Sequence, residues 1–281
     1  MTLINDKTFP TLQYLTSDNM HGVTTIFSTR NGGFSGQTPE TEHLRSMNLL
    51  LRFSPDEEDY DNVGKNYEAI MSSQGFDFKS LVTLRQRHTN NVIAVDEYVI
   101  KSNHNNPFGF NRLPETADAL VTNIKDILLS VRTADCVPIL LYDSRNEAIG
   151  AIHAGWRGTF TQIGTKTVER MTELYGTKPA DIKAAIGPAI DVCCYEVDDI
   201  FYENFRMQYG KEIDNYFTIS PGNKPHCDLK KINKSFLIEA GVLASNIEVS
   251  DLCTMCNPEL FYSHRRSGNK RGTMASFIGM K

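Results

Sequence analysis

Two apolar runs in the middle of the chain, Ile127–Tyr142 and Ala148–Gly158, contain few polar positions and predict buried strands. Cys136 interrupts the first run, and His153 ends the apolar part of the second. Pro138 cannot donate to a sheet ladder, so it indicates an edge, a bulge or a break in the first strand. A thiol and an imidazole therefore lie where buried strands stop, which is where sites in α/β proteins are usually built.

Shorter runs rich in β-branched and apolar residues predict further strands along the whole chain. They are expected at Val23–Thr29, Leu81–Gln86, Asn91–Asp96, Thr116–Thr122, Ile182–Gly187, Ile247–Val249 and Met274–Ile278.

Helical periodicity predicts four helices between these strands. They cover Pro55–Gly75 (with Ser54 as its cap), Thr159–Tyr175, Asp198–Tyr209 and Leu229–Ala240. The segment Tyr98–Glu115, with several Asn and two Pro, predicts a long loop or lid. Because strands and helices alternate irregularly and no linker interrupts the chain, we expect a mixed α/β sandwich in one domain spanning residues 1–281.

Composition narrows the functional class. A net charge of −5 disfavours nucleic-acid binding as the main function, because phosphate backbones require a concentrated basic face. No apolar run reaches the ~18 residues that a membrane span needs, and the first residues do not resemble a signal peptide. We therefore expect a cytoplasmic protein, in which the six cysteines act as thiols or ligands.

Cys136, His153 and a third candidate, His88, form a set of possible metal ligands. Taken singly, each has a plain structural alternative: a buried thiol, a core histidine beside the only Trp, and an exposed loop histidine. Taken together, one thiolate and two imidazoles fit a catalytic zinc, which keeps a fourth position open for water and lowers the pKa of that water. Copper is compatible with the same ligands. A metal-free Cys136 nucleophile activated by His153 is a further alternative.

Four other cysteines form a second pattern, in which the pair Cys193 and Cys194 precedes the C-x-x-C spacing of Cys253 and Cys256. They permit a structural zinc site. Adjacent cysteines rarely chelate one ion well, so buried thiols packed near the first site are the preferred interpretation.

Four motifs carry a resemblance to a known family. Residues 133–138 (TADCVP), 153–158 (HAGWRG), 187–197 (GPAIDVCCYEV) and 260–266 (LFYSHRR) resemble the YfiH/laccase-domain family, as do 28–35 (STRNGGFS) and 46–49 (SMNL). The resemblance extends from about Ser28 to Ile278. The family includes multi-substrate purine nucleoside phosphorylases and was formerly classed as multicopper polyphenol oxidases.

The resemblance implies a single-domain αββα sandwich with mixed sheets and a Zn²⁺ ion on His88, Cys136 and His153. It further implies phosphorolysis of adenosine, inosine and methylthioadenosine, together with adenosine deamination. The family usually has Gln-Val-His-Gly around the first ligand, where this chain has Arg87 and Thr89 beside His88.

For this chemistry we expect Asp135 to act as an acid–base group, alongside the three ligands. Phosphate requires cations or backbone N–H groups, so Arg30 beside Gly32 and Gly33 is the first candidate. The remaining candidates for binding substrate or phosphate are Asn48, Arg157 and Arg265. A structural salt bridge is the alternative for each arginine.

Four other functions remain compatible with the sequence: a metal-free cysteine hydrolase, an amidase that edits peptidoglycan precursors, a copper phenol oxidase, and a zinc-stabilised interaction module without turnover. The expected partners are purine nucleosides and phosphate, with no nucleic acid and no membrane. The chain has seven His and no His-x-His pair, which disfavours a multicopper centre.

Overall fold

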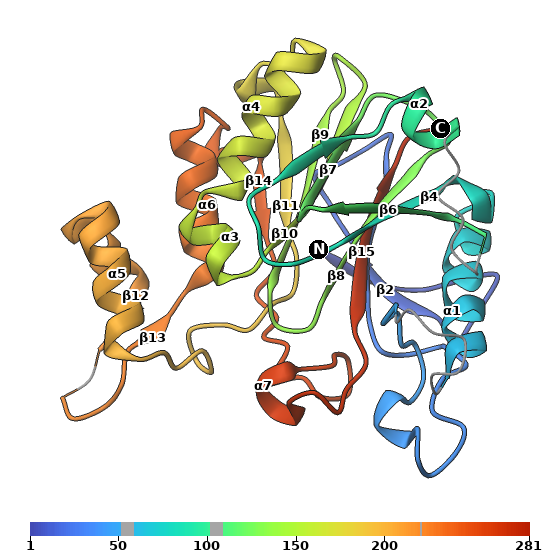
Figure 1. The fold of residues 1–281 in the computed structure, drawn as a ribbon, viewed down its shortest axis with the longest axis horizontal. Coiled ribbons are helices and arrows are strands. Elements are labelled where there is room, and N and C mark those ends of the chain that lie inside the picture. The colour runs from blue at the N-terminus through green and yellow to red at the C-terminus, as the bar shows by residue number, and fades with distance from the viewer. Residues whose placement is uncertain (52–58, 102–108, 220) are drawn as a thin grey trace.

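The computed structural model describes residues 1–51, 59–101, 109–219 and 221–281, and two large sheets form its centre (Figure 1). The seven-stranded sheet has the order β1-β2-β3-β15-β8-β4-β6, and the six-stranded sheet has the order β14-β11-β9-β10-β7-β5. The first contains β1 (Thr2–Asn5), β2 (Gln13–Thr16), β3 (Thr24–Ser28), β4 (Leu81–Arg85), β6 (Asn111–Thr116), β8 (Leu128–Thr133) and β15 (Met274–Gly279). The second contains β5 (Val92–Ala94), β7 (Ala119–Thr122), β9 (Val137–Asp143), β10 (Ala148–Ala154), β11 (Lys183–Ile186) and β14 (Ile247–Val249).

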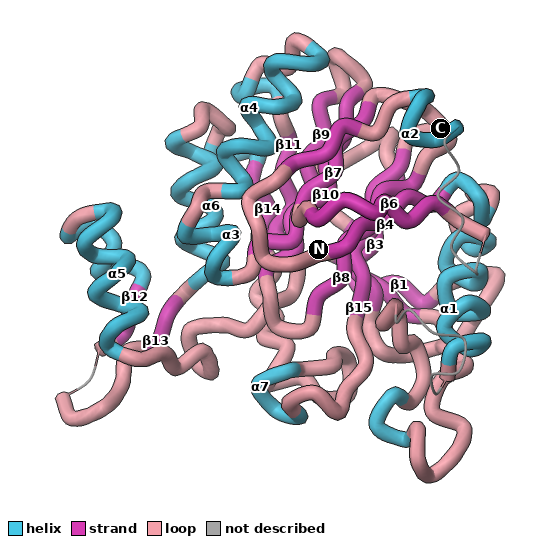
Figure 2. Tube along the Cα trace, viewed as in Figure 1, coloured by secondary structure: helices cyan, strands magenta, loops and turns pink. Residues whose placement is uncertain are grey.

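Helices cover the outer faces of both sheets (Figure 2). The α-helices of the described residues are α1 (Tyr60–Ser73), α2 (Glu97–Lys101), α3 (Trp156–Phe160), α4 (Ile163–Tyr175), α5 (Asp199–Tyr209), α6 (Leu229–Glu239) and α7 (His264–Ser267). Of these, α1 lies outside the seven-stranded sheet, and α3, α4 and α6 lie outside the six-stranded sheet (Figure 1). A small hairpin of β12 (Phe217–Thr218) and β13 (His226–Cys227) lies beside α5. The predicted αββα sandwich is confirmed, and its sheets are mixed because β4, β5 and β11 each have a parallel neighbour.

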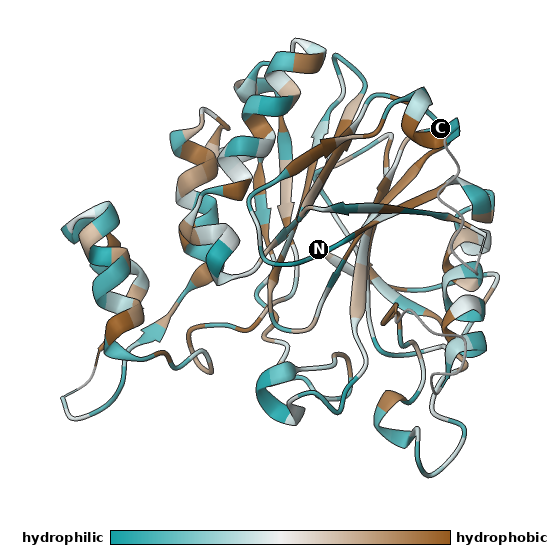
Figure 3. Cartoon of the chain, in the orientation of Figure 1, coloured by the Kyte–Doolittle hydropathy of each residue, from teal (hydrophilic) through white to brown (hydrophobic). Residues whose placement is uncertain are grey.

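Alternation along the central strands explains why the sequence reads as continuous apolar runs. In β9, Ile139 and Leu141 pack under the outer helices, whereas Leu140 and Tyr142 pack between the sheets. In β15, Phe277 faces the layer of α1, and Ile278 faces the inter-sheet layer. Both faces of these strands are therefore buried, which removes the polar half of the usual two-residue period. Figure 3 shows the corresponding hydrophobic colour on the central strands.

The expected single strand over Ile127–Tyr142 is wrong in detail. The run is two strands, β8 and β9, which belong to different sheets and are joined by residues 134–136. The chain crosses between the layers there, so Cys136 lies in a connection and not within a strand. Pro138 does not mark the break, because it is the second residue of β9 and pairs opposite His153.

Two other expectations fall partly on residues that the structure does not describe. The helix predicted from Pro55 is observed as α1 from Tyr60, and Ser54 and Pro55 lie outside the described residues. The loop predicted over Tyr98–Glu115 is wrong at both of its ends, which belong to α2 and β6, and residues 102–108 are not described. The other predicted strands and helices are confirmed within a few residues, although α3 and α4 divide the helix expected at Thr159–Tyr175.

No helix among the described residues has both the length and the apolar character required to cross a membrane.

Candidate metal centre

The side chains of His88, Cys136 and His153 converge, with their ligand atoms all within 4.8 Å of one another. The topology explains why. The connections β4–β5 and β8–β9 both cross from the seven-stranded to the six-stranded sheet, and they carry His88 and Cys136 respectively. His153 is the penultimate residue of β10, whose end pairs with the first residues of β7 and β9. Three segments distant in sequence therefore meet at one end of the sandwich.

A third crossing, β6–β7, carries the buried Asp118, whose carboxylate organises this cluster. Its Oδ1 lies 2.7 Å from His153 Nδ1 and accepts the backbone N–H of His88 at 3.1 Å. Its Oδ2 accepts the backbone N–H groups of Arg87 and Thr89 and the Thr89 hydroxyl at 3.2, 2.6 and 2.8 Å. One carboxylate thus orients His153 and holds the loop that carries His88.

The position of the His88 ring depends on Gly155, which has no side chain. His88 itself has a left-handed backbone, with φ +59°. A Cβ added to Gly155 would lie 2.4 Å from His88 Nδ1 and 3.2 Å from Cys136 Sγ. The absence of a side chain at Gly155 therefore leaves room for the His88 imidazole.

The local electrostatics favour positive charge beside Cys136 and Asp118. Burial disfavours a charged His153, but the charge interaction with Cys136 and then the contact with Asp118 outweigh it and raise the pKa of His153 to about 9. Burial would likewise raise the pKa of Asp118, yet His153 and the donors of Thr89 lower it to about 2. Partial desolvation and the neighbouring His153 lower the pKa of His88, so its ring is neutral and available as a ligand at neutral pH.

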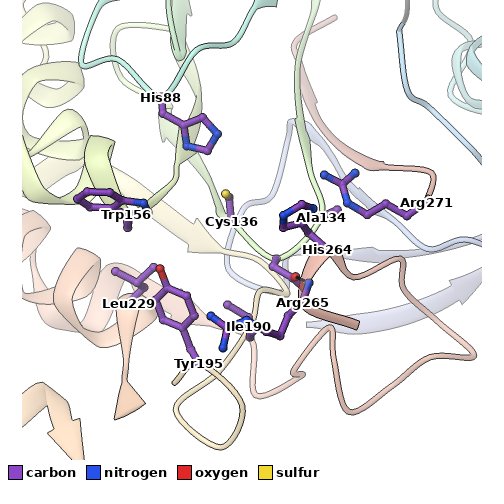
Figure 4. A pocket seen from close by; sticks show the side chains of 11 residues that line it. His88, Ala134, Cys136, Trp156, Ile190, Tyr195, Leu229, His264, Arg265 and Arg271 are labelled. Carbon is purple, nitrogen blue, oxygen red and sulfur yellow. Dashed lines mark hydrogen bonds between the residues drawn. The ribbon is translucent and has the colours of Figure 1, made fainter. Parts of the chain in front are cut away.

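A cavity of about 370 Å³ opens beside the cluster. Figure 4 shows Trp156, Leu229 and Tyr195 on one side of the cavity and Arg271 and His264 across from them, with Cys136 between the two sides. Arg265 reaches to the Tyr195 ring, and His88 lies above Trp156 and Cys136. Ala134, Asp135 and Ile190 complete the lining. The cavity therefore combines possible metal ligands, an aromatic surface and side chains suited to an anion.

The two arginines of this cavity have different surroundings. Arg265 donates from Nη1 and Nη2 to the Glu196 carbonyl at 3.0 and 2.9 Å, and its guanidinium lies 5.3 Å from the centre of the Tyr195 ring. Arg271 donates from Nη1 to the Gly272 carbonyl at 3.1 Å, and its buried Nε has no hydrogen-bond partner. Burial lowers the pKa of Arg271 from its ordinary value. Arg271 thus keeps donor capacity that no protein group uses.

Asp135, the expected acid–base residue, lines the cavity, but both of its carboxylate oxygens already accept hydrogen bonds from the protein. Oδ1 accepts the Thr254 hydroxyl at 2.6 Å, and Oδ2 accepts the Ser263 hydroxyl at 3.0 Å and the Arg265 N–H at 2.7 Å. These bonds attach two later loops to the β8–β9 crossing. The arrangement favours positioning over proton transfer, and the catalytic role of Asp135 stays a prediction.

The other predicted binding residues do not line the cavity. Arg30 donates to the Pro258 carbonyl at 3.1 Å and covers the Tyr262 ring, and Arg157 covers the Trp156 ring. Asn48 is buried, and its Oδ1 accepts the N–H groups of Leu50 and Thr273 at 3.0 and 3.2 Å. Asn48 therefore supports the segment that follows Arg271. Of the four residues expected to bind substrate or phosphate, only Arg265 lines the cavity.

Sequence reasoning did not find Asp118 or the cavity residues Trp156, Tyr195, His264 and Arg271 as site residues. Asp118 directly precedes β7, so the rule applied to Cys136, a polar residue where a buried strand meets a connection, could have found it. Trp156 and Tyr195 stood inside two of the motifs. Arg271 stands in the basic pair Lys270-Arg271, which could bind a small phosphate but is more often a solvated face, so the sequence alone did not single it out.

The chain is similar to known proteins over most of its length. Residues 24–281 match the family described as multi-copper polyphenol oxidoreductase laccase. The chain is 37% identical over 266 residues to purine nucleoside phosphorylase YlmD of Bacillus subtilis (strain 168), covering 95% of this chain and 91% of that protein. It is 37% identical over 198 residues to adenosine deaminase RL5 from an unknown prokaryotic organism, covering 70% and 74%. The crystal structure of Bacillus licheniformis hypothetical protein YfiH aligns with a TM-score of 0.85 at 33% identity, covering 99% of each chain.

Proposed function

Because this chain belongs to the multi-copper polyphenol oxidoreductase laccase family, whose relatives include proteins named purine nucleoside phosphorylase and adenosine deaminase, we propose that it is a zinc-dependent enzyme of purine nucleosides. Its activities are phosphorolysis of adenosine, inosine and methylthioadenosine, and deamination of adenosine. The observation that carries the proposal is a Cys/His₂ set beside one cavity, which His88 and Cys136 line together with an aromatic wall and an arginine whose Nε has no hydrogen-bond partner.

The donor set fits one zinc ion on His88, Cys136 and His153. Ligand atoms around a tetrahedral zinc lie about 3–4 Å apart. Three donors already within 4.8 Å of one another need only small side-chain movements to reach that spacing. Asp118 gives the set its outer support, because an acceptor on His153 Nδ1 fixes the ring and leaves Nε2 for the ion. Zinc bound there supplies Lewis acidity and an activated water.

The aromatic wall is suited to the base of a nucleoside. Trp156 and Tyr195 line the cavity near the metal ligands, and stacking of a purine on an aromatic ring is worth about 1–3 kcal/mol. Burial raises the pKa of Tyr195, which keeps its hydroxyl neutral at physiological pH. The wall therefore offers stacking and a neutral hydroxyl without a competing negative charge.

The side of the cavity that carries Arg271 and His264 is suited to phosphate. Arg271 can offer donors of a planar guanidinium, which matches phosphate geometry, and the neighbouring His264 holds Nδ1 against the Gly268 carbonyl. Arg265, whose guanidinium lies against Tyr195, can offer further donors from the aromatic side. In phosphorolysis, a phosphate oxygen forms a bond to the ribose C1′ while the bond from C1′ to the purine nitrogen breaks. The base leaves with that electron pair and takes up a proton. Arg271 on one side and a stacking surface on the other would hold the two reactants at opposite ends of the breaking bond.

The test combines metal content with product analysis on the same preparation. Zinc is quantified by mass spectrometry, and adenosine is incubated with and without phosphate and followed by HPLC. We expect zinc in the wild-type chain, adenine that depends on phosphate, and inosine that does not. Cys136→Ala should lose the ion bound at this site and both products, whereas Cys227→Ala, which removes a buried thiol outside the cavity, should keep them.

Zinc-free protein that leaves adenosine unchanged would overturn the proposal. Full activity of Cys136→Ala would also contradict it, since both reactions are assigned to one site. Copper in place of zinc, with oxygen uptake on phenols, would instead favour the oxidase that the family description names.

A further inference from the structure

Four cysteines outside the cavity form a second cluster of possible metal ligands, and three of these four cysteines are not buried. The Sγ atoms of Cys193, Cys194, Cys253 and Cys256 all lie within 4.8 Å of one another. Cys193 and Cys256 are exposed, Cys194 is intermediate and only Cys253 is buried. Packing therefore does not account for the cluster, because exposed thiols gain little hydrophobic free energy by gathering. The prediction of buried thiols is wrong for three of the four.

We propose that these four cysteines form a structural zinc site, separate from the candidate metal centre at His88, Cys136 and His153. The Sγ of Cys256 lies 3.6 Å from that of Cys193 and 3.3 Å from that of Cys194, and the two adjacent sulfurs are 3.6 Å apart. Four sulfurs bonded tetrahedrally to zinc at about 2.3 Å are separated by about 3.8 Å. The cluster already has nearly the size that one ion requires.

The local backbone explains how two adjacent cysteines can serve one ion. Residues 192–194 form a turn, in which the N–H groups of Cys194 and Tyr195 both donate to the Asp191 carbonyl at 2.8 Å. In a strand, successive side chains would point to opposite faces. The turn instead brings the sulfurs of Cys193 and Cys194 to the same side, which removes the objection to adjacent ligands.

The C-x-x-C segment provides the other half of the site. Residues 254–256 form a turn, and the backbone N–H and the side-chain amide of Asn257 both donate to the Cys253 carbonyl, at 3.2 and 2.8 Å. This turn brings Cys256 back beside Cys253. Arg266 adds positive charge nearby, donating to the Thr254 and Met255 carbonyls at 3.3 and 2.9 Å.

Both loops are held in place independently of the sulfurs, so the site is preorganised. The buried Lys230 of α6 pairs with Asp191 at 2.7 Å and donates to the Ser250 carbonyl at 2.7 Å. The Thr254 N–H donates to the Ala189 carbonyl at 3.0 Å. A zinc ion would cross-link loops that already touch, at little cost in conformational entropy.

The position of this site indicates what it stabilises. Cys194 directly precedes Tyr195, and Arg265 donates to the Cys194 and Glu196 carbonyls at 3.5 and 3.0 Å. Thr254, inside the C-x-x-C segment, donates to Asp135. A zinc ion on the four cysteines would therefore fix the loops that carry Tyr195, Arg265 and Asp135 into the cavity wall.

The experiment measures zinc per chain and intact mass in the full-length protein and three variants. The double variant Cys193→Ser/Cys256→Ser changes only exposed residues, so it should fold, and we expect it to bind one zinc ion fewer than the wild type. Cys136→Ala should keep the ion on the four cysteines, and Cys227→Ser, a free thiol outside both clusters, should match the wild type. If the site at His88, Cys136 and His153 binds no zinc, the wild-type protein will contain less zinc in total. The double variant will still contain one zinc ion fewer than the wild type, so the two proposals are tested separately.

A second readout identifies the ligands. In protein produced with Co²⁺ in place of Zn²⁺, thiolate-to-metal charge-transfer absorption should fall strongly in the double variant and only slightly in Cys136→Ala, because four thiolates are assigned to one site and one to the other. Equal metal content in the wild type and the double variant would overturn the proposal. Disulfide bonds among the four cysteines would also overturn the proposal. They would show as a wild-type intact mass about 2 Da lower for each disulfide, with thiols that react with an alkylating agent only after reduction.

Discussion

Asp118 Oδ1 lies 2.7 Å from His153 Nδ1, and the same carboxylate accepts three backbone N–H groups from the loop that carries His88. A single buried side chain thus joins two of the three candidate ligands, although it coordinates nothing in the proposed site. The Thr89 hydroxyl adds a further bond to Asp118.

Asp118→Asn should weaken metal binding about 10–100-fold, the usual effect of losing an outer-shell carboxylate. The amide keeps the shape of the side chain, but it replaces one acceptor oxygen with a donor, which cannot satisfy both His153 and the loop N–H groups. Zinc retention against a chelator series would measure the change. Thr89→Ala removes one bond of the same carboxylate and should give a smaller effect. If Asp118→Asn binds zinc as tightly as the wild type, Asp118 does not stabilise the metal site.

Gly155→Ala should displace His88 and lower metal content without unfolding the protein. The new Cβ would lie 2.4 Å from His88 Nδ1, while the backbone of Gly155 (φ −66°, ψ 169°) is accessible to alanine. Gly164→Ala is a matched control, because its Cβ would meet Leu237 at 3.5 Å, which is an ordinary contact. Thermal unfolding and zinc content of both variants would separate a local from a global effect. If Gly155→Ala still binds a full complement of zinc, the loop that carries His88 can move aside for the new Cβ, and the prediction is wrong.

Arg271→Met should raise the KM for phosphate about tenfold to a hundredfold, since a hydrogen bond to a charged group contributes about 1.5–3 kcal/mol. The side chain length is similar, so packing is largely kept. Deamination of adenosine, which uses no phosphate, should change little. Lys270→Met removes the same charge from the exposed neighbour and should leave KM unaltered. An equal loss of both activities in Arg271→Met would assign Arg271 a structural role instead.

The hairpin between β9 and β10 provides a pH-dependent prediction away from the metal centre. Burial alone would raise the pKa of Asp143, but the side chain of Asn146 and the N–H groups of Arg145 and Asn146 hold it below its ordinary value. Wild-type protein should exceed Asp143→Asn in stability by about 1–2 kcal/mol at neutral pH.

The Asp143 contribution is complete above the unfolded-state pKa of about 3.9 and is lost as pH falls through the lower folded-state pKa. Urea unfolding at a series of pH values would follow the difference between the two proteins. It should shrink on acidification below about pH 4. A difference that is constant with pH would mean that the charge of Asp143 is not responsible, and exposed Asp251→Asn should show no such difference at any pH.

Local pattern in the sequence determined much of the fold and part of the site. Apolar periodicity is a property of neighbouring residues, so the helix ended by Gly176 and the strands of the sandwich could be predicted. Cys136 and His153 could be found for the same reason, because each interrupts or ends an apolar run.

Only the tertiary structure decided how these pieces meet. The run containing Cys136 is largely apolar because both of its strands, β8 and β9, are buried on both faces. The hydropathy of the sequence therefore did not reveal that the chain crosses from one sheet to the other between them. Asp118, Gly155 and the four clustered cysteines acquire their roles from partners tens of residues or more away. Such distances in space are set by strand register and sheet stacking, which no local sequence pattern encodes.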